Sequence, residues 1–425
     1  MNKYLKGILL ILITVFTFTL VSCGENTEPA TDFYDVTFVD YDGTVLKTVT
    51  CIVGEVCDIT PPTEPDNKEN CDFTRWSLFD SEYTDIDRDT EVEAIYTLDN
   101  RVITIGGRSI VFYSFFIITG IVVSLFLGLK ECDRLSIKRD DLIDGFLWIV
   151  PVAILGSRLW YVAFELGNFV YGGFFPSLLR IIGFSSGTLD FSNFGLAGLA
   201  IHGAFTTAII CAYFYTRRKK MDLLRIIDIV AIGFILAQAF GRWGNFFNQE
   251  AHGGIVGGIT NNVANLSLEQ QFSFLKNTLH LPEFIVNNMY IQRGLHSIGV
   301  EPLTGFYHPT FFYESSINLV GFAIMLFLRR SKRIYFGELL SFYLIWYGGL
   351  RIFIETMRTD PLVFDIFGIT MKSAIVTSVL MILGGIALST YIRIKRKGQT
   401  YGTVPGYFGN KKVITEAAEV IEEKE

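Results

Sequence analysis

Long runs of apolar residues recur along the chain after Arg108 and form its most informative pattern. Seven of them lie near residues 110–129, 143–165, 195–216, 223–240, 309–329, 336–356 and 370–393. A bilayer core about 30 Å thick needs a helix of about 20 apolar residues, because lipid cannot hydrogen-bond to exposed peptide groups. The pattern therefore predicts a mainly α fold in which residues 101–395 form a bundle of seven transmembrane helices.

Clusters of lysine and arginine follow every second apolar run and predict how the bundle is oriented. The clusters are Lys130, Arg134, Lys138 and Arg139; Arg217, Arg218, Lys219 and Lys220; Arg329, Arg330, Lys332 and Arg333; and Arg393, Lys395, Arg396 and Lys397. Connections rich in these residues stay in the cytoplasm. We therefore expect a multi-pass protein of the cell membrane, with an outer cap at about 246–308 and a polar cytoplasmic tail at 396–425.

The first 23 residues have the layout of a secretory signal peptide. Lys3 and Lys6 precede an apolar run from Gly7 to Val21, which is short for a membrane span. The run ends in Leu20-Val21-Ser22-Cys23, where small residues before a cysteine resemble a lipobox. We expect cleavage and lipidation at Cys23. The alternative is an uncleaved anchor helix with an incidental cysteine.

Short alternating runs follow a polar linker at 24–33 and predict a small β domain at 34–98. Val36-Thr37-Phe38-Val39 and the segment from Val92 to Tyr96 both alternate apolar and polar residues. Asp42-Gly43 is one of the turn signals between such runs. Because a signal peptide precedes it, the domain is expected outside the cell.

The β domain carries two further features. Its segment Phe73-Thr74-Arg75-Trp76-Ser77 resembles the small β-grasp-like repeats of Gram-positive surface proteins. It also holds Cys51, Cys57 and Cys71, and a disulfide is allowed outside the cell. Any pairing among the three leaves one cysteine over.

The composition supports a membrane protein and excludes several other classes. Mean hydropathy is +0.38 and charged residues make up 19% of the 425 residues, against about 25% in ordinary soluble domains. The net charge of −7 comes from carboxylates crowded into residues 24–100 and the C-terminal tail, so nucleic acid is not an expected partner. The six cysteines form no CxxC pair, which argues against a zinc knuckle or a thioredoxin-like motif.

The end of the fourth apolar run carries the densest group of polar residues. The segment Gly241 to Glu250 contains Arg242, Asn245 and Glu250 at the expected outer membrane surface. An ionisable residue inside a span is costly and usually functional. The alternative is that Arg242 extends to the membrane surface while the glycines only allow close helix packing. The density of polar groups favours a functional site.

Other apolar runs also contain polar residues, and the group at the end of the fourth run makes a functional role for them more plausible than each residue would alone. Arg351 and Glu355 are four residues apart and lie on one helix face, so they could form an ion pair that only neutralises a buried charge. His308 precedes Pro309 at a helix start and could be a capping group. His202 and Tyr113, taken alone, are more often structural residues.

The membrane portion resembles the prolipoprotein diacylglyceryl transferase family over about residues 101–395. The motifs that carry the resemblance are Gly241 to Glu250, Ile201-His202-Gly203, His308 to Glu314, and Tyr347 to Glu355 with Arg358. The resemblance places the family's important residues at Tyr113, His202, Arg242, Asn245, Glu250, Gly253, His308, Tyr347, Arg351 and Glu355. Ala204 and Phe311 depart from the usual pattern, and the β domain is an addition to it.

The resemblance implies an enzyme of lipoprotein biosynthesis that uses phosphatidylglycerol and prolipoprotein signal peptides as substrates. It would transfer the sn-1,2-diacylglyceryl group to the lipobox cysteine as a thioether and release glycerol phosphate. Guanidinium groups suit a phosphate, which makes Arg242 and Arg351 the expected phosphate ligands. The thiol must lose a proton, and His202, Glu250 and Glu355 all stay open as the base.

The remaining family positions are expected to bind the lipid, with Tyr113, Asn245, Gly253, His308 and Tyr347 as candidates. No cofactor is expected, and no ligand spacing suggests a metal ion.

Two other classes of protein stay open. A secondary transporter could use buried arginine and glutamate to bind an ion or solute, although an internal repeat is expected there and none is visible. A noncatalytic anchor could display the β domain, but it would need one span and no polar interior.

Overall fold

The computed structural model describes residues 33–53, 55, 57–65, 68–105, 108–184, 186–189, 198–261, 263–291, 304–358, 363–366, 369–395 and 400–404. The predicted signal peptide with Cys23 lies outside the described residues, as do most of the predicted linker and tail. The chain divides into two compact units, Met1–Tyr96 and Thr97–Glu425.

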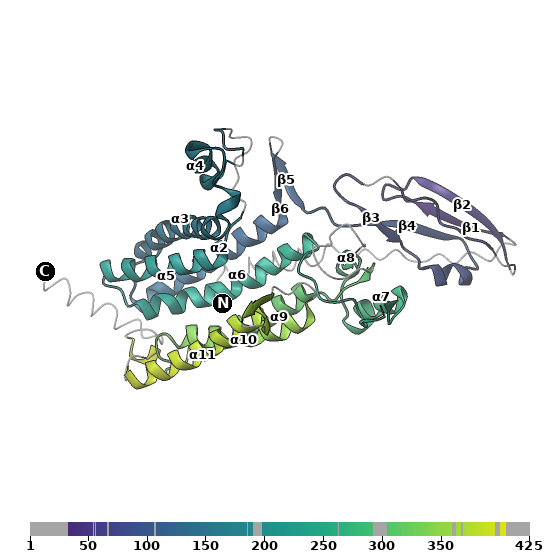
Figure 1. The fold of residues 1–425 in the computed structure, drawn as a ribbon. Helices are drawn as coiled ribbons and strands as arrows, with labels where there is room; N and C mark the ends of the chain where they lie inside the picture. The colour runs from purple at the N-terminus through teal and green to yellow at the C-terminus, as the bar shows by residue number, and fades with distance from the viewer. Residues whose placement is uncertain are drawn as a thin grey trace. The chain divides into compact units, whose positions relative to one another are not determined.

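The first unit is a mixed four-stranded sheet with the strand order β2-β1-β4-β3 (Figure 1). The strands are β1 (Phe33–Val39), β2 (Val45–Ile52), β3 (Phe73–Trp76) and β4 (Thr90–Tyr96), and the 3-10 helix η1 spans Asp80–Asp85. β1 pairs antiparallel with β2 and parallel with β4, while β3 pairs antiparallel with β4. Gly43, at φ 82°, allows the tight turn between β1 and β2.

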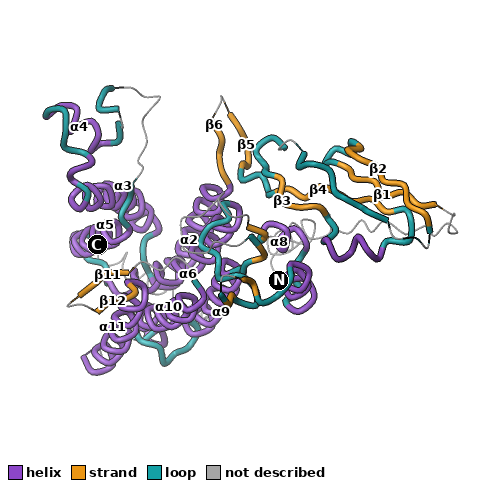
Figure 2. Tube along the Cα trace, turned by 45° about the vertical axis from the view of Figure 1, so that its right-hand side comes forward, coloured by secondary structure: helices purple, strands orange, loops and turns teal. Residues whose placement is uncertain are grey.

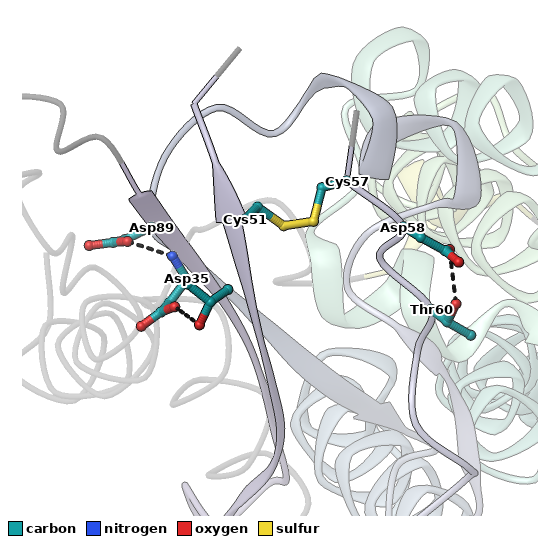
Figure 3. Close-up of a disulfide and its surroundings, with 7 residues drawn as sticks. Asp35, Cys51, Cys57, Asp58, Thr60 and Asp89 are labelled. Carbon is teal, nitrogen blue, oxygen red and sulfur yellow. Dashed lines mark hydrogen bonds between the residues drawn. A yellow bond between two sulfur atoms is a disulfide. The ribbon is translucent and has the colours of Figure 1, made fainter. Parts of the chain in front are cut away.

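Alternation along β1 builds the core of this unit, because successive side chains point to opposite faces. Val36 and Phe38 are 0% exposed, and the ring of Trp76 meets Phe38 edge to face at 5.1 Å. Cys51 in β2 forms a disulfide with Cys57, which leaves the buried Cys71 outside the pair (Figure 3). A small N-terminal β region is therefore confirmed.

The second unit is mainly helical, and the strands described in it pair only in two-stranded sheets (Figure 2). Its elements are β5 (Arg101–Ile105), β6 (Arg108–Val111), α2 (Phe112–Leu135), α3 (Arg139–Phe164), η2 (Leu166–Asn168), α4 (Phe174–Ile182), α5 (Ile201–Arg218), α6 (Leu223–Phe247), β7 (Ile259–Thr260), β8 (Val263–Ala264), α7 (Leu268–Ser273), the π-helical η4 (Phe274–Thr278), α8 (Glu283–Asn288), β9 (Tyr290–Ile291), β10 (Gly305–Phe306), α9 (Thr310–Leu328), α10 (Glu338–Met357), β11 (Val363–Ile366), β12 (Ile369–Lys372), α11 (Ser373–Lys395) and η5 (Tyr401–Thr403).

Every predicted apolar run coincides with a long helix. Within the described residues, five helices are long and apolar enough to cross a membrane: α2, α3, α6, α9 and α11. The other two runs became α5 and α10, which are not among the five. α10 carries Glu338, Arg351 and Glu355 along its length, and these charged residues lower its hydropathy.

Apolar side chains face outward along several helices, as expected where lipid is the solvent. On α2, Phe115, Ile118 and Val122 are 45%, 58% and 59% exposed. In contrast, α6 is the most buried of the five apolar helices and packs against α2, α9 and α10 (Figure 1). The residues at the end of α6 are thus surrounded by other helices.

Small residues bring α2 close to α6. A Cβ added at Gly120 would lie 3.1 Å from the Cα of Ala237, and Ser124 donates a hydrogen bond to the Gly233 carbonyl at 2.8 Å. Close backbone approach of this kind gives helices in lipid their packing contacts.

Asp228 links three segments at the end of the unit where α6 begins. Its fully buried carboxylate accepts hydrogen bonds from Gly337 N at 2.8 Å and Leu340 N at 3.0 Å, at the first turn of α10. It also accepts one from the Tyr401 hydroxyl at 3.0 Å. A carboxylate from α6 therefore satisfies amides that the start of α10 leaves unpaired.

We expect Asp228→Ala to lower the free energy of unfolding by about 3 kcal/mol, because Gly337 N, Leu340 N and the Tyr401 hydroxyl all lose this buried acceptor. Tyr401→Phe removes one hydrogen bond and should cost about 1 kcal/mol. Thermal unfolding of the two variants in detergent measures the difference. Equal losses in the two variants would refute the linking role of Asp228.

Candidate functional site

A chain of ion pairs joins α6, α9 and α10 where α6 ends and α9 begins. Arg242 Nη2 lies 2.6 Å from Glu314 Oε2, and Arg351 Nη1 lies 3.6 Å from Glu314 Oε1. Arg351 Nη2 also lies 2.8 Å from Glu355 Oε2, so the two residues form the ion pair that their spacing allows. The two arginines therefore share one glutamate that comes from a third helix.

Burial differs between the two signs of charge. Glu314 and Glu355 are each 1% exposed, whereas the side chains of Arg242 and Arg351 are 19% and 18% exposed. A guanidinium has five N–H donors, so the contacts with described residues leave donors for a ligand. Two cations held by buried carboxylates are suited to binding an anion at the exposed side.

A second set of polar contacts extends from Arg242 past the end of α6. Arg242 Nη1 donates to Asn245 Oδ1 at 3.4 Å, and Asn245 Nδ2 donates to Glu250 Oε1 at 2.8 Å. Asn248 Nδ2 reaches the same oxygen of Glu250 at 3.3 Å. The structure thus brings the polar residues of the Gly241 to Glu250 motif into one network with the ion pairs.

Tyr113, at the start of α2, packs directly on this end of α6. A Cβ added at Gly244 would lie 2.6 Å from Tyr113 Cδ2 and 3.0 Å from its Cα. Only glycine at this position lets the two helices approach so closely. Tyr113 is 37% exposed, so this contact leaves part of its side chain accessible.

Backbone hydrogen bonds tie the ends of the three site helices together. Gly253 N donates to His308 O, and His308 N donates to Gly254 O, both at 2.9 Å. Gly254 N donates to Met357 O, at the end of α10, at 3.0 Å. These bonds hold the starts and ends of the helices in register.

His308 takes part in these backbone hydrogen bonds and not in the ion pairs. Its Nδ1 is 3.2 Å from the Tyr313 hydroxyl, and burial lowers the pKa of the imidazole. The ordinary pKa of histidine is near 6.5, so lowering it keeps the ring neutral at neutral pH. Tyr347, one turn before Arg351, stacks on Tyr343 with ring centroids 5.8 Å apart.

His202 is placed apart from the ion pairs. It is exposed on α5, a helix that packs mainly against α3, where a Cβ added at Gly203 would lie 2.3 Å from Trp160 Cβ. Among the described residues, His202 forms no hydrogen bond or ion pair. The structure brings together the other charged residues predicted from the sequence, but not this one.

Glu314 is the central residue that the sequence did not single out as a site residue. Its signal was an acidic residue inside the apolar run 309–329, which is costly unless it is paired. Among the described residues, no group of three or more histidine, cysteine, aspartate and glutamate side chains is placed to hold a metal ion.

Five helices that are apolar enough to cross a membrane, and a buried network of arginine and glutamate that joins α6, α9 and α10, define a multi-pass membrane protein with a charged site between its helices. A model of the prolipoprotein diacylglyceryl transferase family matches residues 100–391. The chain belongs to this family.

Relatives that carry the family's name are similar to this chain over most of its length. The phosphatidylglycerol–prolipoprotein diacylglyceryl transferase of Streptococcus sanguinis is 38% identical over 300 residues, which cover 70% of this chain and 97% of the relative. The protein of the same name from Listeria innocua is 36% identical over 307 residues, covering 72% and 94%. That of Streptococcus uberis is 38% identical over 306 residues, covering 72% and 98%.

The backbone hydrogen bonds at Gly253 can be tested by substituting Gly253 and, as a control, Gly349. We expect Gly253→Ala to loosen them, because the new Cβ would lie 2.8 Å from His308 Cβ, and overpacking costs about 1–3 kcal/mol. Gly349→Ala in α10 faces open space and should leave these hydrogen bonds unchanged. Hydrogen exchange of the amides at Gly254 and His308 measures the effect. Unchanged exchange in Gly253→Ala would contradict it.

Proposed function

We propose that the protein transfers the sn-1,2-diacylglyceryl group of phosphatidylglycerol to the lipobox cysteine of prolipoproteins. The observation that carries this proposal is the pair of arginines held by Glu314 in a membrane protein of this family. The names of the relatives support the substrates and the reaction.

In the proposed reaction, the cysteine thiolate attacks the glycerol carbon that bears the phosphate. A carbon–sulfur bond forms and the carbon–oxygen bond breaks, so that glycerol phosphate leaves with the bonding electrons. Arg242 and Arg351 would bind this phosphate and stabilise the negative charge that grows on it. Glu314 would fix the spacing between the two guanidinium groups.

The thiol proton must pass to a base, for which three residues were candidates. Glu355 is paired with Arg351, and His202 lies apart from the ion pairs. Glu250 is exposed, and its contacts are amide groups linked to Arg242 through Asn245. This geometry favours Glu250, with the nearby arginines lowering the pKa of the incoming thiol.

The remaining parts of the proposal concern the lipid and the membrane. Tyr113, Asn245, Gly253, His308 and Tyr347 are proposed to shape the lipid site. Seven spans are proposed, with α5 and α10 crossing beside the five more apolar helices. The basic clusters support a site that faces outward and a cytoplasmic C-terminus.

The segments before the first span are proposed to face outward as well. The sheet, with its parallel pair β1 and β4, supports the β-grasp-like interpretation of residues 34–98. Lipidation of Cys23 would make the protein a substrate of its own reaction, and mass spectrometry of the mature N-terminus tests this. The transporter and anchor interpretations predict no thioether product.

The first prediction concerns the phosphate ligands. In micelles containing phosphatidylglycerol and a lipobox peptide, wild type should form the thioether, and Arg242→Ala should lower kcat/KM at least about 100-fold. Arg242→Lys keeps the charge but loses the paired donors, so recovery should be partial. Arg218→Ala, at an exposed position, is the control. Absence of product with wild type favours the transporter or anchor.

The second prediction separates the candidate bases. We expect Glu250→Gln to reduce kcat by about 100-fold or more, and His202→Gln to reduce it by less than about tenfold. Raising the pH should partly rescue Glu250→Gln, because more of the peptide thiol is then ionised. The reverse order of losses would assign the base to His202.

A further inference from the structure

Beyond the arginine site, the interior of the helical unit holds polar groups without a protein partner. Within the described residues, both amide atoms of Asn318, Nε1 of Trp346 and Oε1 of Gln238 lack a hydrogen-bond partner. Asn318 is 0% exposed. A buried polar group left unpaired costs about 1–3 kcal/mol, so such a group needs an explanation.

The register between α6 and α9 places two of these groups next to the arginine site. Three contacts define that register: Arg242 with Glu314, Ala239 with Ser315, and Ile235 with Gly321. Gln238 precedes Arg242 by four residues and Asn318 follows Glu314 by four, so each lies on the same helix face. They lie one helical turn, about 5.4 Å, beyond the ion pair.

The third group lies farther along the same face of α9. A Cβ added at Gly321 would be 2.4 Å from Trp346 Nε1, so the indole N–H lies against α9. Gly321 follows Asn318 by three residues, which places the two on one face. Asn318 Nδ2 and Trp346 Nε1 are therefore two unpaired donors, aligned along α9 beyond the arginines.

We propose that these two donors bind the ester carbonyl groups of the lipid whose phosphate binds Arg242 and Arg351. This inference rests on the proposed function. In a glycerophospholipid the phosphate and two acyl esters occupy neighbouring carbons of one glycerol, and the esters lie deeper in the membrane. An ester carbonyl only accepts hydrogen bonds, which matches the amide and indole N–H groups.

Gln238 is the neighbour of the donors on α6, and its Oε1, unpaired among the described residues like Asn318 Oδ1, is an acceptor that an ester carbonyl leaves unpaired. Gln238 is held in place by its Nε2 hydrogen bond to the Tyr343 hydroxyl at 3.0 Å, and it borders the subsite from α6. Phosphate held at one end and esters at the other would fix the glycerol between them. The carbon attacked by the thiolate lies in that stretch, so the subsite would orient the reacting bond.

The test compares two lipids that share a phosphoglycerol headgroup and chain length, one with acyl ester links and one with alkyl ether links. Wild type should show a kcat/KM about tenfold higher for the diester lipid. Asn318→Leu and Trp346→Phe each remove one donor, and each should reduce this preference about threefold. Their rates with the diether lipid should fall by less than their rates with the diester lipid.

Ser315→Ala provides the matched control, because it also removes a buried hydrogen bond on α9, from Ser315 Oγ to Ala239 O at 3.0 Å. It should change the rates with both lipids by one common factor. A wild type that does not distinguish the lipids, or an Asn318→Leu variant that loses both rates equally, would overturn the subsite.

Failure of the proposed function gives a different result. If wild type transfers neither lipid, the transferase proposal fails, and binding of the two lipids by native mass spectrometry then decides the subsite alone. Tighter binding of the diester lipid, lost in Asn318→Leu, would support it. Equal binding of both lipids would overturn it.

Discussion

The site depends on the ion pairs that the buried carboxylate of Glu314 forms. A charge between helices in a membrane is tolerated only when it is paired, and Glu314 pairs with arginines from two different helices. Removing it would leave two guanidinium groups close together without a shared counter-ion. The requirement for charge pairing thus determines how α6, α9 and α10 meet, and it leaves the cations, rather than the carboxylates, at the exposed side.

Much of the helical fold could be predicted because lipid imposes a simple rule on hydropathy and length. Each apolar run became a helix, and the i,i+4 spacing of Arg351 and Glu355 allowed for their ion pair, since both features depend on local geometry. The role of Glu314 could not be predicted in this way. Its partners are set by the register of helices distant in sequence, and only the folded arrangement shows that Arg242 and Arg351 share it.

The same limit explains the position of His202. The sequence places it near a helix end together with other polar residues, but not on a particular face of the bundle. In the fold, glycines and small residues pack α5 against α3, and His202 lies exposed there. The polar interior at Asn318 could not be predicted either, because an asparagine in an apolar run becomes informative only when the fold leaves it buried without a partner among the described residues.

The backbone ties at Gly253, Gly254 and His308 have a consequence for how this architecture can vary. They close the long connection between α6 and α9 at its base, and Met357 joins α10 to the same point. The described part of this connection is also packed on the end of α6, because Asn288 Nδ2 donates a hydrogen bond to the Phe246 carbonyl at 2.9 Å and Leu275 and Val286 are fully buried. A change in the length of this connection within these packed residues would therefore be transmitted to the end of α6, where the charged site lies.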